Sequence, residues 1–128
     1  MLKIFLVEDS TPVRKRMAVL FGSIEGVAVV GEAEEPDGAL AGIAASHADV
    51  VIVDLRLTES SGLDVLAALA QNDPSVITMV LTNHSGASFR QACMAAGARY
   101  FFDKTEEFDL ARSTVEQIAR ERLAGTHR

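Results

Sequence analysis

The chain has 128 residues, 48% of them hydrophobic, which is enough for one core and leaves no room for a second folded module. Its formal net charge is −6, and its 12 lysine and arginine residues are scattered along the sequence. Proteins that follow a phosphate backbone gather such residues into a positive patch or stripe. We therefore expect no direct binding to nucleic acid.

The N-terminal segment and the single cysteine indicate where the protein resides. The first apolar run meets Glu8 and Asp9 too early for a secretory signal, and no run approaches the length that spans a bilayer. Cys93 cannot form an internal disulfide and is predicted to pack as a buried thiol on a helix. We expect a cytoplasmic protein that does not contact membranes.

Short apolar runs rich in β-branched residues recur at residues 2–7, 27–30, 50–53, 76–81 and 100–102. The run at 50–53 shows no polar alternation, which is typical of a strand covered on both faces of a parallel sheet. The pattern therefore predicts five parallel strands with helices on both sides.

Each run precedes a segment with apolar residues at helical spacing. The helices are expected from Ser10 or Thr11, over 37–46, 62–70 and 87–96, and from Glu106 onwards. Ser10 or Thr11 should cap the first helix, in which Pro12 suits an early position, and Gly97 should stop the fourth. The predicted inward residues are Val13, Met17, Leu20, Phe21 and Ile24; Leu40, Ile43 and Ala44; Leu66, Leu69 and Ala70; Phe89, Ala92, Cys93 and Ala96; Val115, Ile118 and Ala119.

Five strand-helix units with right-handed crossovers predict a doubly wound α/β fold. We expect a flavodoxin-like parallel sheet with strand order 2-1-3-4-5. Residues 1–124 should form the domain and residues 125–128 a short frayed tail. No linker or repeat is evident, so no attached output domain is expected.

Acidic residues follow two strands that the predicted order places side by side. Glu8 and Asp9 come directly after the first strand, and Asp54 comes directly after the third. Ligands of such sheets bind beyond the carboxyl ends of the strands where the strand order reverses. Because like charges that close repel one another, a hard divalent cation such as Mg²⁺ is expected between them.

Two further strand ends carry a hydroxyl and a positive charge. Thr82 ends the fourth strand, and Lys104 follows the fifth. A carboxylate nucleophile, a metal, a hydroxyl and an ammonium group match phosphoryl transfer, in which positioning and charge neutralisation dominate. The implied product is an acyl phosphate on Asp54.

These residues resemble the receiver domains of bacterial two-component response regulators over nearly the whole chain. Glu8 and Asp9, Asp54, Gly62 in the following loop, Thr82 and Lys104 occur in the family's order. The resemblance implies a phosphoacceptor at Asp54 and a Mg²⁺ ion held by Glu8, Asp9, Asp54 and the backbone carbonyl of Arg56. It also implies that Thr82 and Lys104 contact the phosphoryl oxygens.

The resemblance further implies a switch and a set of partners. Phe101 matches the family's switch aromatic, which turns inward when the threonine moves toward the phosphoryl group; its neighbours Tyr100 and Phe102 leave a plain core role almost equally open. The phosphoryl donor would be a sensor histidine kinase or a histidine phosphotransfer protein, and the output would pass to a protein target. A homodimer through the fourth and fifth helices is expected by analogy.

Some positions near the proposed site depart from the family pattern. Asn83 stands where a small residue is usual, and Thr105 stands where a proline follows the lysine. As a hypothesis, Asn83 slows hydrolysis of the acyl phosphate. Arg56 and His84 at the rim could tune the phosphoryl lifetime, although a solvated loop histidine is the safer interpretation of His84.

Two other functions fit the sequence less well. A haloacid-dehalogenase type hydrolase also places a nucleophilic aspartate after a strand, but it expects a second acid where Arg56 stands. A receiver that has lost phosphorylation would lack site residues that this chain retains. The leading interpretation is a signalling switch that catalyses its own phosphorylation and slow dephosphorylation and is not a conventional turnover enzyme.

Overall fold

The computed structural model describes residues 1–35, 38–54, 59–83 and 86–126, in which strands and helices alternate. The expected order of five strand-helix units is confirmed. The elements are β1 (Leu2–Glu8), α1 (Thr11–Gly22), β2 (Val27–Ala33), α2 (Ala39–Ser46), β3 (Val50–Asp54), α3 (Glu59–Asn72), β4 (Ile77–Thr82), α4 (Ala87–Ala95), β5 (Tyr100–Asp103) and α5 (Phe108–Thr126).

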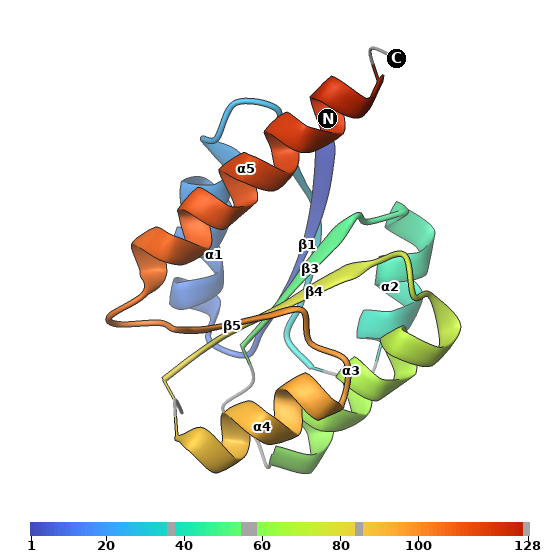
Figure 1. Ribbon diagram of the computed structural model, residues 1–128, viewed down its shortest axis with the longest axis vertical. Coiled ribbons are helices and arrows are strands. Elements are labelled where there is room, and N and C mark those ends of the chain that lie inside the picture. The colour runs from blue at the N-terminus through green and yellow to red at the C-terminus, as the bar shows by residue number, and fades with distance from the viewer. Residues whose placement is uncertain (36–37, 55–58, 84–85, 127–128) are drawn as a thin grey trace.

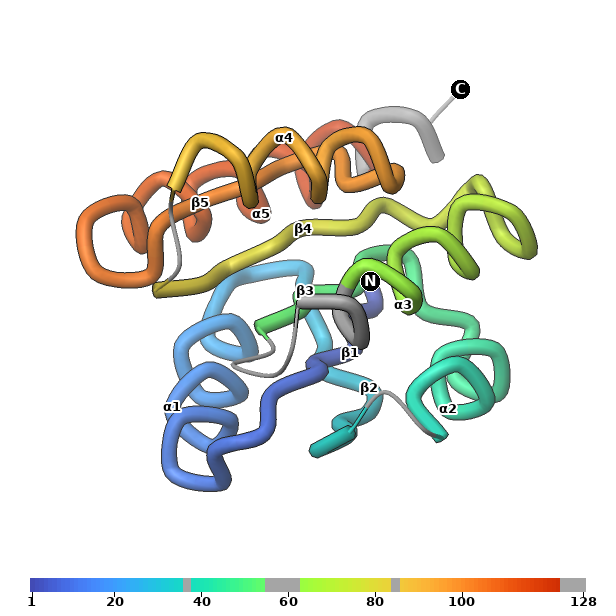
Figure 2. Tube along the Cα trace, turned by 90° about the horizontal axis from the view of Figure 1, so that it is seen from below, coloured from blue at the N-terminus to red at the C-terminus, as the bar shows by residue number. Residues whose placement is uncertain are grey.

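The five strands form one parallel sheet in the order β2-β1-β3-β4-β5. Figure 2 shows the strands side by side in this order. This confirms the predicted flavodoxin-like topology. The order reverses between β1 and β3, and the register there pairs Glu8 with Asp54. Residues at the carboxyl ends of these two strands are therefore brought to the same edge of the sheet.

Helices cover both faces of the sheet (Figure 1). Helices α1 and α5 pack over one face, where Phe21, Leu6 and Val115 lie in one buried cluster. Helices α2, α3 and α4 pack over the other, where Val51, Leu66 and Cys93 lie in a second cluster. All five residues of β3 are buried, because the central strand is covered on both sides.

The predicted inward faces of two helices need correction. Ala39 and Ile43 are the buried residues of α2, whereas Leu40 and Ala44 are exposed. In α3, Leu66 and Leu69 are buried and Ala70 is exposed. Each misplaced residue directly follows a buried one, and one residue turns a helix by about 100°, which carries the next side chain to the solvent side.

The helix boundaries also differ in part from the expected ones. Gly62, expected in a loop, lies within α3, which already begins at Glu59. Helix α2 is bounded by two residues with left-handed backbone conformations. Gly38 precedes the helix and His47 follows it. Gly97, with φ of 117°, follows the end of α4 as predicted. None of the helices in the described ranges is long and apolar enough to cross a membrane.

Candidate functional site

Four of the predicted site residues lie at the carboxyl edge of the sheet. Glu8, Asp54 and Thr82 are the last residues of β1, β3 and β4, and Lys104 directly follows β5. Glu8, Asp54 and Thr82 are at most 1% exposed, although all three are polar. Buried polar side chains at one edge require compensating partners, so this edge is the candidate site.

The Lys104 ammonium group lies between two of the carboxylates. Its Nζ is 2.9 Å from Oε1 of Glu8 and forms an ion pair with Oδ2 of Asp54. The structure thus brings Glu8, Asp54 and Lys104 together, although they are up to 96 positions apart in the sequence. Here the lysine supplies the positive charge that the clustered carboxylates require.

This charge cluster shifts the pKa of two groups. Burial is the main reason why the pKa of the Glu8 carboxyl lies above its ordinary value, and Asp54 acts in the same direction. Burial by itself disfavours the Lys104 ammonium group, but contacts with Asp54 and Glu8 outweigh it and raise the pKa of Lys104. Lys104 is therefore cationic throughout the physiological pH range.

The turn between β1 and α1 is held by backbone and side-chain hydrogen bonds. The Ser10 N–H donates to Oε2 of Glu8 at 2.7 Å, and Arg14 donates from Nη1 to the Glu8 carbonyl oxygen at 2.9 Å. Ser10 occupies the N-cap position of α1, which confirms one of the two expected cap residues, but its hydroxyl makes no capping hydrogen bond. The Thr11 hydroxyl donates to Oε1 of Glu34 instead.

The turn between β5 and α5 fixes Lys104 from its backbone. The Lys104 N–H donates to the carbonyl oxygen of Thr82 at 2.9 Å. Oδ1 of Asp103 accepts hydrogen bonds from the N–H groups of Thr105 and Glu106. The exposed Asn83 also reaches this turn, because its Oδ1 accepts a hydrogen bond from the Thr105 hydroxyl at 3.3 Å.

Phe101 is buried on the face of the sheet that α4 covers. Its ring meets the ring of Phe89 edge-on at 6.0 Å between centroids, and the guanidinium carbon of Arg90 lies 5.6 Å from its centroid. Tyr100 and Phe102 point to the opposite face and stack on each other. Strand alternation thus places Phe101 between the sheet and α4.

The donor set at this edge suits a hard cation such as Mg²⁺. Glu8, Asp9 and Asp54 offer oxygen ligands, and the buried Oδ1 of Asp54 has no hydrogen-bond partner among the described residues. Those residues contain no group of three or more His, Cys, Asp or Glu side chains already arranged around a metal position. The residues therefore fit Mg²⁺ by chemistry, while the ammonium group of Lys104 occupies the space between Glu8 and Asp54.

Two of the predicted site residues are not described, and two residues near the site were not predicted. Arg56 and His84 lie outside the described residues. Arg14 and Asp103 were not predicted from the sequence. Arg14 gives no local signal, because its partners Glu32 and Glu34 reach it only through the pairing of β1 with β2.

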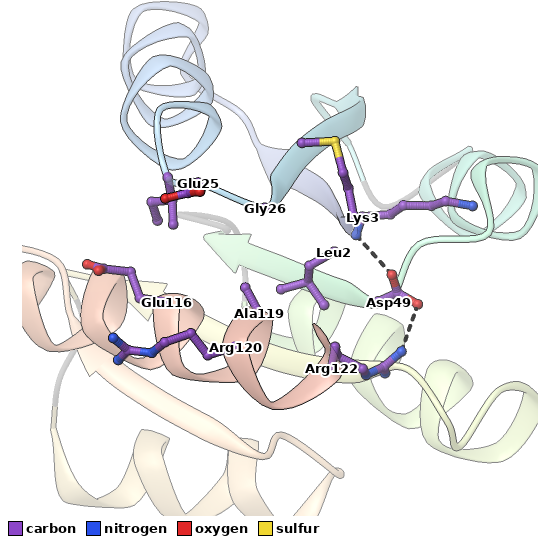
Figure 3. Close-up of a pocket in the computed structure, with 11 residues that line it drawn as sticks. Leu2, Lys3, Glu25, Gly26, Asp49, Glu116, Ala119, Arg120 and Arg122 are labelled. Atoms are coloured by element: carbon purple, nitrogen blue, oxygen red, sulfur yellow. Dashed lines mark hydrogen bonds and ion pairs between the residues drawn. The ribbon is translucent and has the colours of Figure 1, made fainter. Parts of the chain in front are cut away.

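A pocket of about 850 Å³ lies at the opposite edge of the sheet, near the start of β1 (Figure 3). It is lined by residues of both charge signs, and Asp49 bridges the Lys3 backbone N–H and the Arg122 guanidinium. The charged side chains drawn there pair locally or point away from one another (Figure 3). None of the predicted site residues within the described ranges is among those that line this pocket.

Comparison with known proteins identifies the family. Residues 4–116 match the family model of the response regulator receiver domain. The chain is 31% identical over 117 residues to the DNA-binding transcriptional activator DevR/DosR of Mycobacterium tuberculosis, covering 91% of this chain and 54% of that protein. It spans about half the length of such curated relatives.

Solved structures of receiver domains share the fold. A LuxR-family two-component response regulator from Aurantimonas sp. SI85-9A1 has a TM-score of 0.84 at 27% identity, over 93% of this chain and 85% of that one. The signal receiver domain of the putative response regulator NarL from Mycobacterium tuberculosis has a TM-score of 0.75 at 24% identity, over 97% of each chain. Sequence and fold agree, and the chain belongs to the family of response regulator receiver domains of two-component systems.

Proposed function

We propose that this chain is a phosphoacceptor switch, which takes a phosphoryl group onto Asp54 with the help of Mg²⁺. The observation that carries the proposal is the state of the Asp54 carboxylate. It is 1% exposed at the carboxyl edge of the sheet, with Lys104 paired to Oδ2 and no partner for Oδ1 among the described residues. One oxygen is thus charge-compensated, and the other is available as a nucleophile.

The chemistry follows from the charges and donors around Asp54. An oxygen of Asp54 attacks the phosphorus of a phosphohistidine, a P–O bond forms, and the P–N bond to the imidazole breaks. The Lys104 ammonium and the Thr82 hydroxyl stabilise negative charge that spreads over the phosphoryl oxygens. Mg²⁺, held by Glu8, Asp9, Asp54 and the Arg56 carbonyl, would neutralise further phosphoryl charge and orient the group. Hydrolysis of the acyl phosphate resets the switch.

The donors and targets follow from the family. Response regulators interact with sensor kinases, and we propose a sensor histidine kinase or a histidine phosphotransfer protein as the donor for this chain. The relative DevR/DosR is a DNA-binding transcriptional activator, and this chain matches about half of it. With a net charge of −6, this receiver segment would signal through a protein partner and not through direct contact with DNA.

The signal would leave through Thr82 and Phe101. Thr82 ends β4 at the site, and Phe101 in the neighbouring strand β5 packs against Phe89 of α4. A shift of Thr82 toward the phosphoryl group would free space for Phe101 to repack, and this would change the surface of α4, β5 and α5. The same surface would present the homodimer interface.

Intact-mass measurements with acetyl phosphate test the proposal. The parent should gain one phosphoryl group with Mg²⁺ and none without it, and Asp54→Ala should gain none in either case. Asp49→Ala is the matched control, because Asp49 lies at the opposite edge of the sheet, at the pocket of Figure 3, and should leave the gain intact. An equal gain in Asp54→Ala, or no Mg²⁺-dependent gain in the parent, would overturn the proposal.

A further inference from the structure

We propose that Arg14 is a positioning residue, which holds the turn bearing Glu8 and Asp9 in the geometry that Mg²⁺ binding requires. This inference rests on the proposed function, because it concerns the same metal. It adds a residue that lies outside the ligand set and acts through the backbone. The starting point is the set of contacts made by a single, nearly buried guanidinium group.

The Arg14 side chain is 11% exposed and connects three elements. Nη1 donates to the carbonyl oxygen of Glu8, the last residue of β1, at 2.9 Å. Nε donates to Oε1 of Glu32 in β2 at 3.0 Å, and Nη2 donates to Oε1 of Glu34 just beyond β2 at 3.2 Å. Because a guanidinium group is planar and rigid, three such contacts fix its position closely.

The backbone of Arg14 holds the other end of the same turn. Its N–H donates to the carbonyl oxygen of Ser10 at 2.8 Å and so closes the first turn of α1. The Ser10 N–H in turn donates to Oε2 of Glu8. Asp9 therefore lies between two residues whose carbonyl oxygens are both bound by Arg14. The orientation of the Glu8 and Asp9 carboxylates depends on this clamp.

The anchors of Arg14 determine how it acts. Glu32 and Glu34 are both paired with its guanidinium group, so its positive charge is offset close to where it arises. A positive charge without these partners would repel a divalent cation at the nearby carboxylates. We therefore expect Arg14 to strengthen Mg²⁺ binding by positioning the turn. This effect should exceed the repulsion between its remaining positive charge and the metal.

The two mechanisms predict opposite changes in Mg²⁺ affinity when Arg14 is replaced. If Arg14 acted through charge alone, its removal would strengthen Mg²⁺ binding. If it positions the turn, removal weakens binding, and a lysine, which keeps the charge but lacks the planar fork, does not restore it. Residues that orient metal ligands from outside the ligand set commonly change metal affinity by about 10- to 100-fold.

Calorimetric titration with MgCl₂ at constant ionic strength tests the inference. Arg14→Met and Arg14→Lys should each weaken Mg²⁺ binding by about tenfold. Arg122→Met is the matched control, because Arg122 pairs with Asp49 at the far edge of the sheet. That variant should stay within about twofold of the parent, since the screened charge at that distance acts weakly on the metal.

Phosphorylation by acetyl phosphate gives a second readout. The Mg²⁺ concentration for half-maximal rate should rise in Arg14→Met, whereas the rate at saturating Mg²⁺ should stay within about threefold of the parent. Glu32→Gln keeps the side-chain size, weakens one anchor and should shift Mg²⁺ affinity in the same direction by a smaller factor. A melting curve without metal shows whether Arg14→Met folds. If it does not, the Mg²⁺ affinity of Glu32→Gln tests the inference in its place.

Unchanged or tighter Mg²⁺ binding in Arg14→Lys and Glu32→Gln would overturn this inference and leave the proposed function standing. Parent-like Mg²⁺ affinity in Arg14→Lys, beside weakened affinity in Arg14→Met, would also overturn it, because the planar guanidinium fork would then not be required. A parent chain that neither binds Mg²⁺ nor accepts a phosphoryl group would overturn both the inference and the proposed function.

Discussion

At the scale of single residues, Asn83 and Thr105 join two turns that carry site residues. Asn83 follows Thr82, Thr105 follows Lys104, and the Thr105 hydroxyl donates to Oδ1 of Asn83 at 3.3 Å. Both side chains are exposed, so the contact adds little to stability. We propose instead that an amide held between these turns narrows the approach of water to Asp54.

We predict that Asn83→Ala shortens the lifetime of the acyl phosphate on Asp54. The expected change is about two- to tenfold, or ~0.4–1.4 kcal/mol in the barrier to hydrolysis. Thr105→Val, which removes the donor at constant shape, should shorten it by a smaller factor. The loss of phosphorylated mass with time after removal of acetyl phosphate measures this. An unchanged or longer lifetime in Asn83→Ala would refute the role of Asn83.

Cys93 is a second residue whose surroundings decide its chemistry. It is 1% exposed on α4 within the core, and burial raises the pKa of its thiol to about 11. Because the folded pKa lies above the ordinary value of 9.0, the folded state keeps a proton that the unfolded state loses between these values. The stabilisation from this group is complete below pH 9 and is lost as pH rises toward 11.

Two measurements check this prediction for Cys93. A disulfide reagent at pH 8 should react slowly with the native chain and quickly in denaturant, since only the thiolate is nucleophilic. From pH 9 to 11, the parent should lose up to ~3 kcal/mol more unfolding free energy than Cys93→Ala. Equal losses in parent and variant, or rapid native labelling, would show that the thiol is accessible.

At the scale of elements, the packing of β1 against β2 and α2 depends on two glycines. A Cβ atom at Gly31 in β2 would lie 2.6 Å from Cε2 of Phe5, and one at Gly42 in α2 would lie 2.9 Å from its Cζ. The Phe5 ring is 3% exposed and so has little room to move. The Phe5 ring can lie against the backbone of β2 and α2 because neither glycine carries a side chain.

We predict that Gly31→Ala destabilises the fold by ~1–3 kcal/mol, the usual cost of overpacking a core. Phe5→Leu in the same chain should relieve most of the additional cost, because the clash is with the ring. Gly22→Ala at the end of α1 is the matched control, since the nearest atom to its added Cβ atom, Cγ2 of Val29, lies at an ordinary 3.8 Å, and it should be neutral or slightly stabilising. Denaturant unfolding of the four variants measures the coupling, and independent effects of Gly31→Ala and Phe5→Leu would contradict it.

At the scale of the whole molecule, the expected dimer would use the face of α4, β5 and α5. Met94 of α4 is 43% exposed and Leu110 of α5 is 54% exposed, so apolar surface is present on both helices. The net charge of −6 opposes close approach of two copies, and apolar contact at the interface has to outweigh that repulsion.

We predict that phosphorylation promotes dimerisation through this face. In sedimentation velocity runs with acetyl phosphate and Mg²⁺, the parent should show a dimer that Asp54→Ala does not form. Met94→Glu should weaken the dimer, because it places like charges at the interface. Val19→Glu on α1, where Val19 is 71% exposed, should leave the dimer intact. Equal weakening by both substitutions would place the interface elsewhere.

The topology and the types of side chain at the carboxyl edge of the sheet could be predicted from the sequence. Hydrophobic periodicity and strand-end residues carry that information locally, and the strand order places Glu8 beside Asp54 by a general rule of doubly wound sheets. The end of α4 at Gly97 could also be predicted, because the end of a helix is encoded by adjacent residues.

The contacts between side chains on different elements could not be predicted from the sequence. The Arg14 clamp depends on the register of β1 with β2, and the Lys104 contacts depend on a turn that follows another strand. The exposure of Leu40 and Ala44 depends on how α2 is rotated about its axis, which the small apolar residues around it do not specify. The contacts of Arg14 and Lys104 join residues far apart in the chain, and the rotation of α2 depends on the elements that it packs against. No local pattern encodes either feature, because the packing of the whole domain sets their geometry.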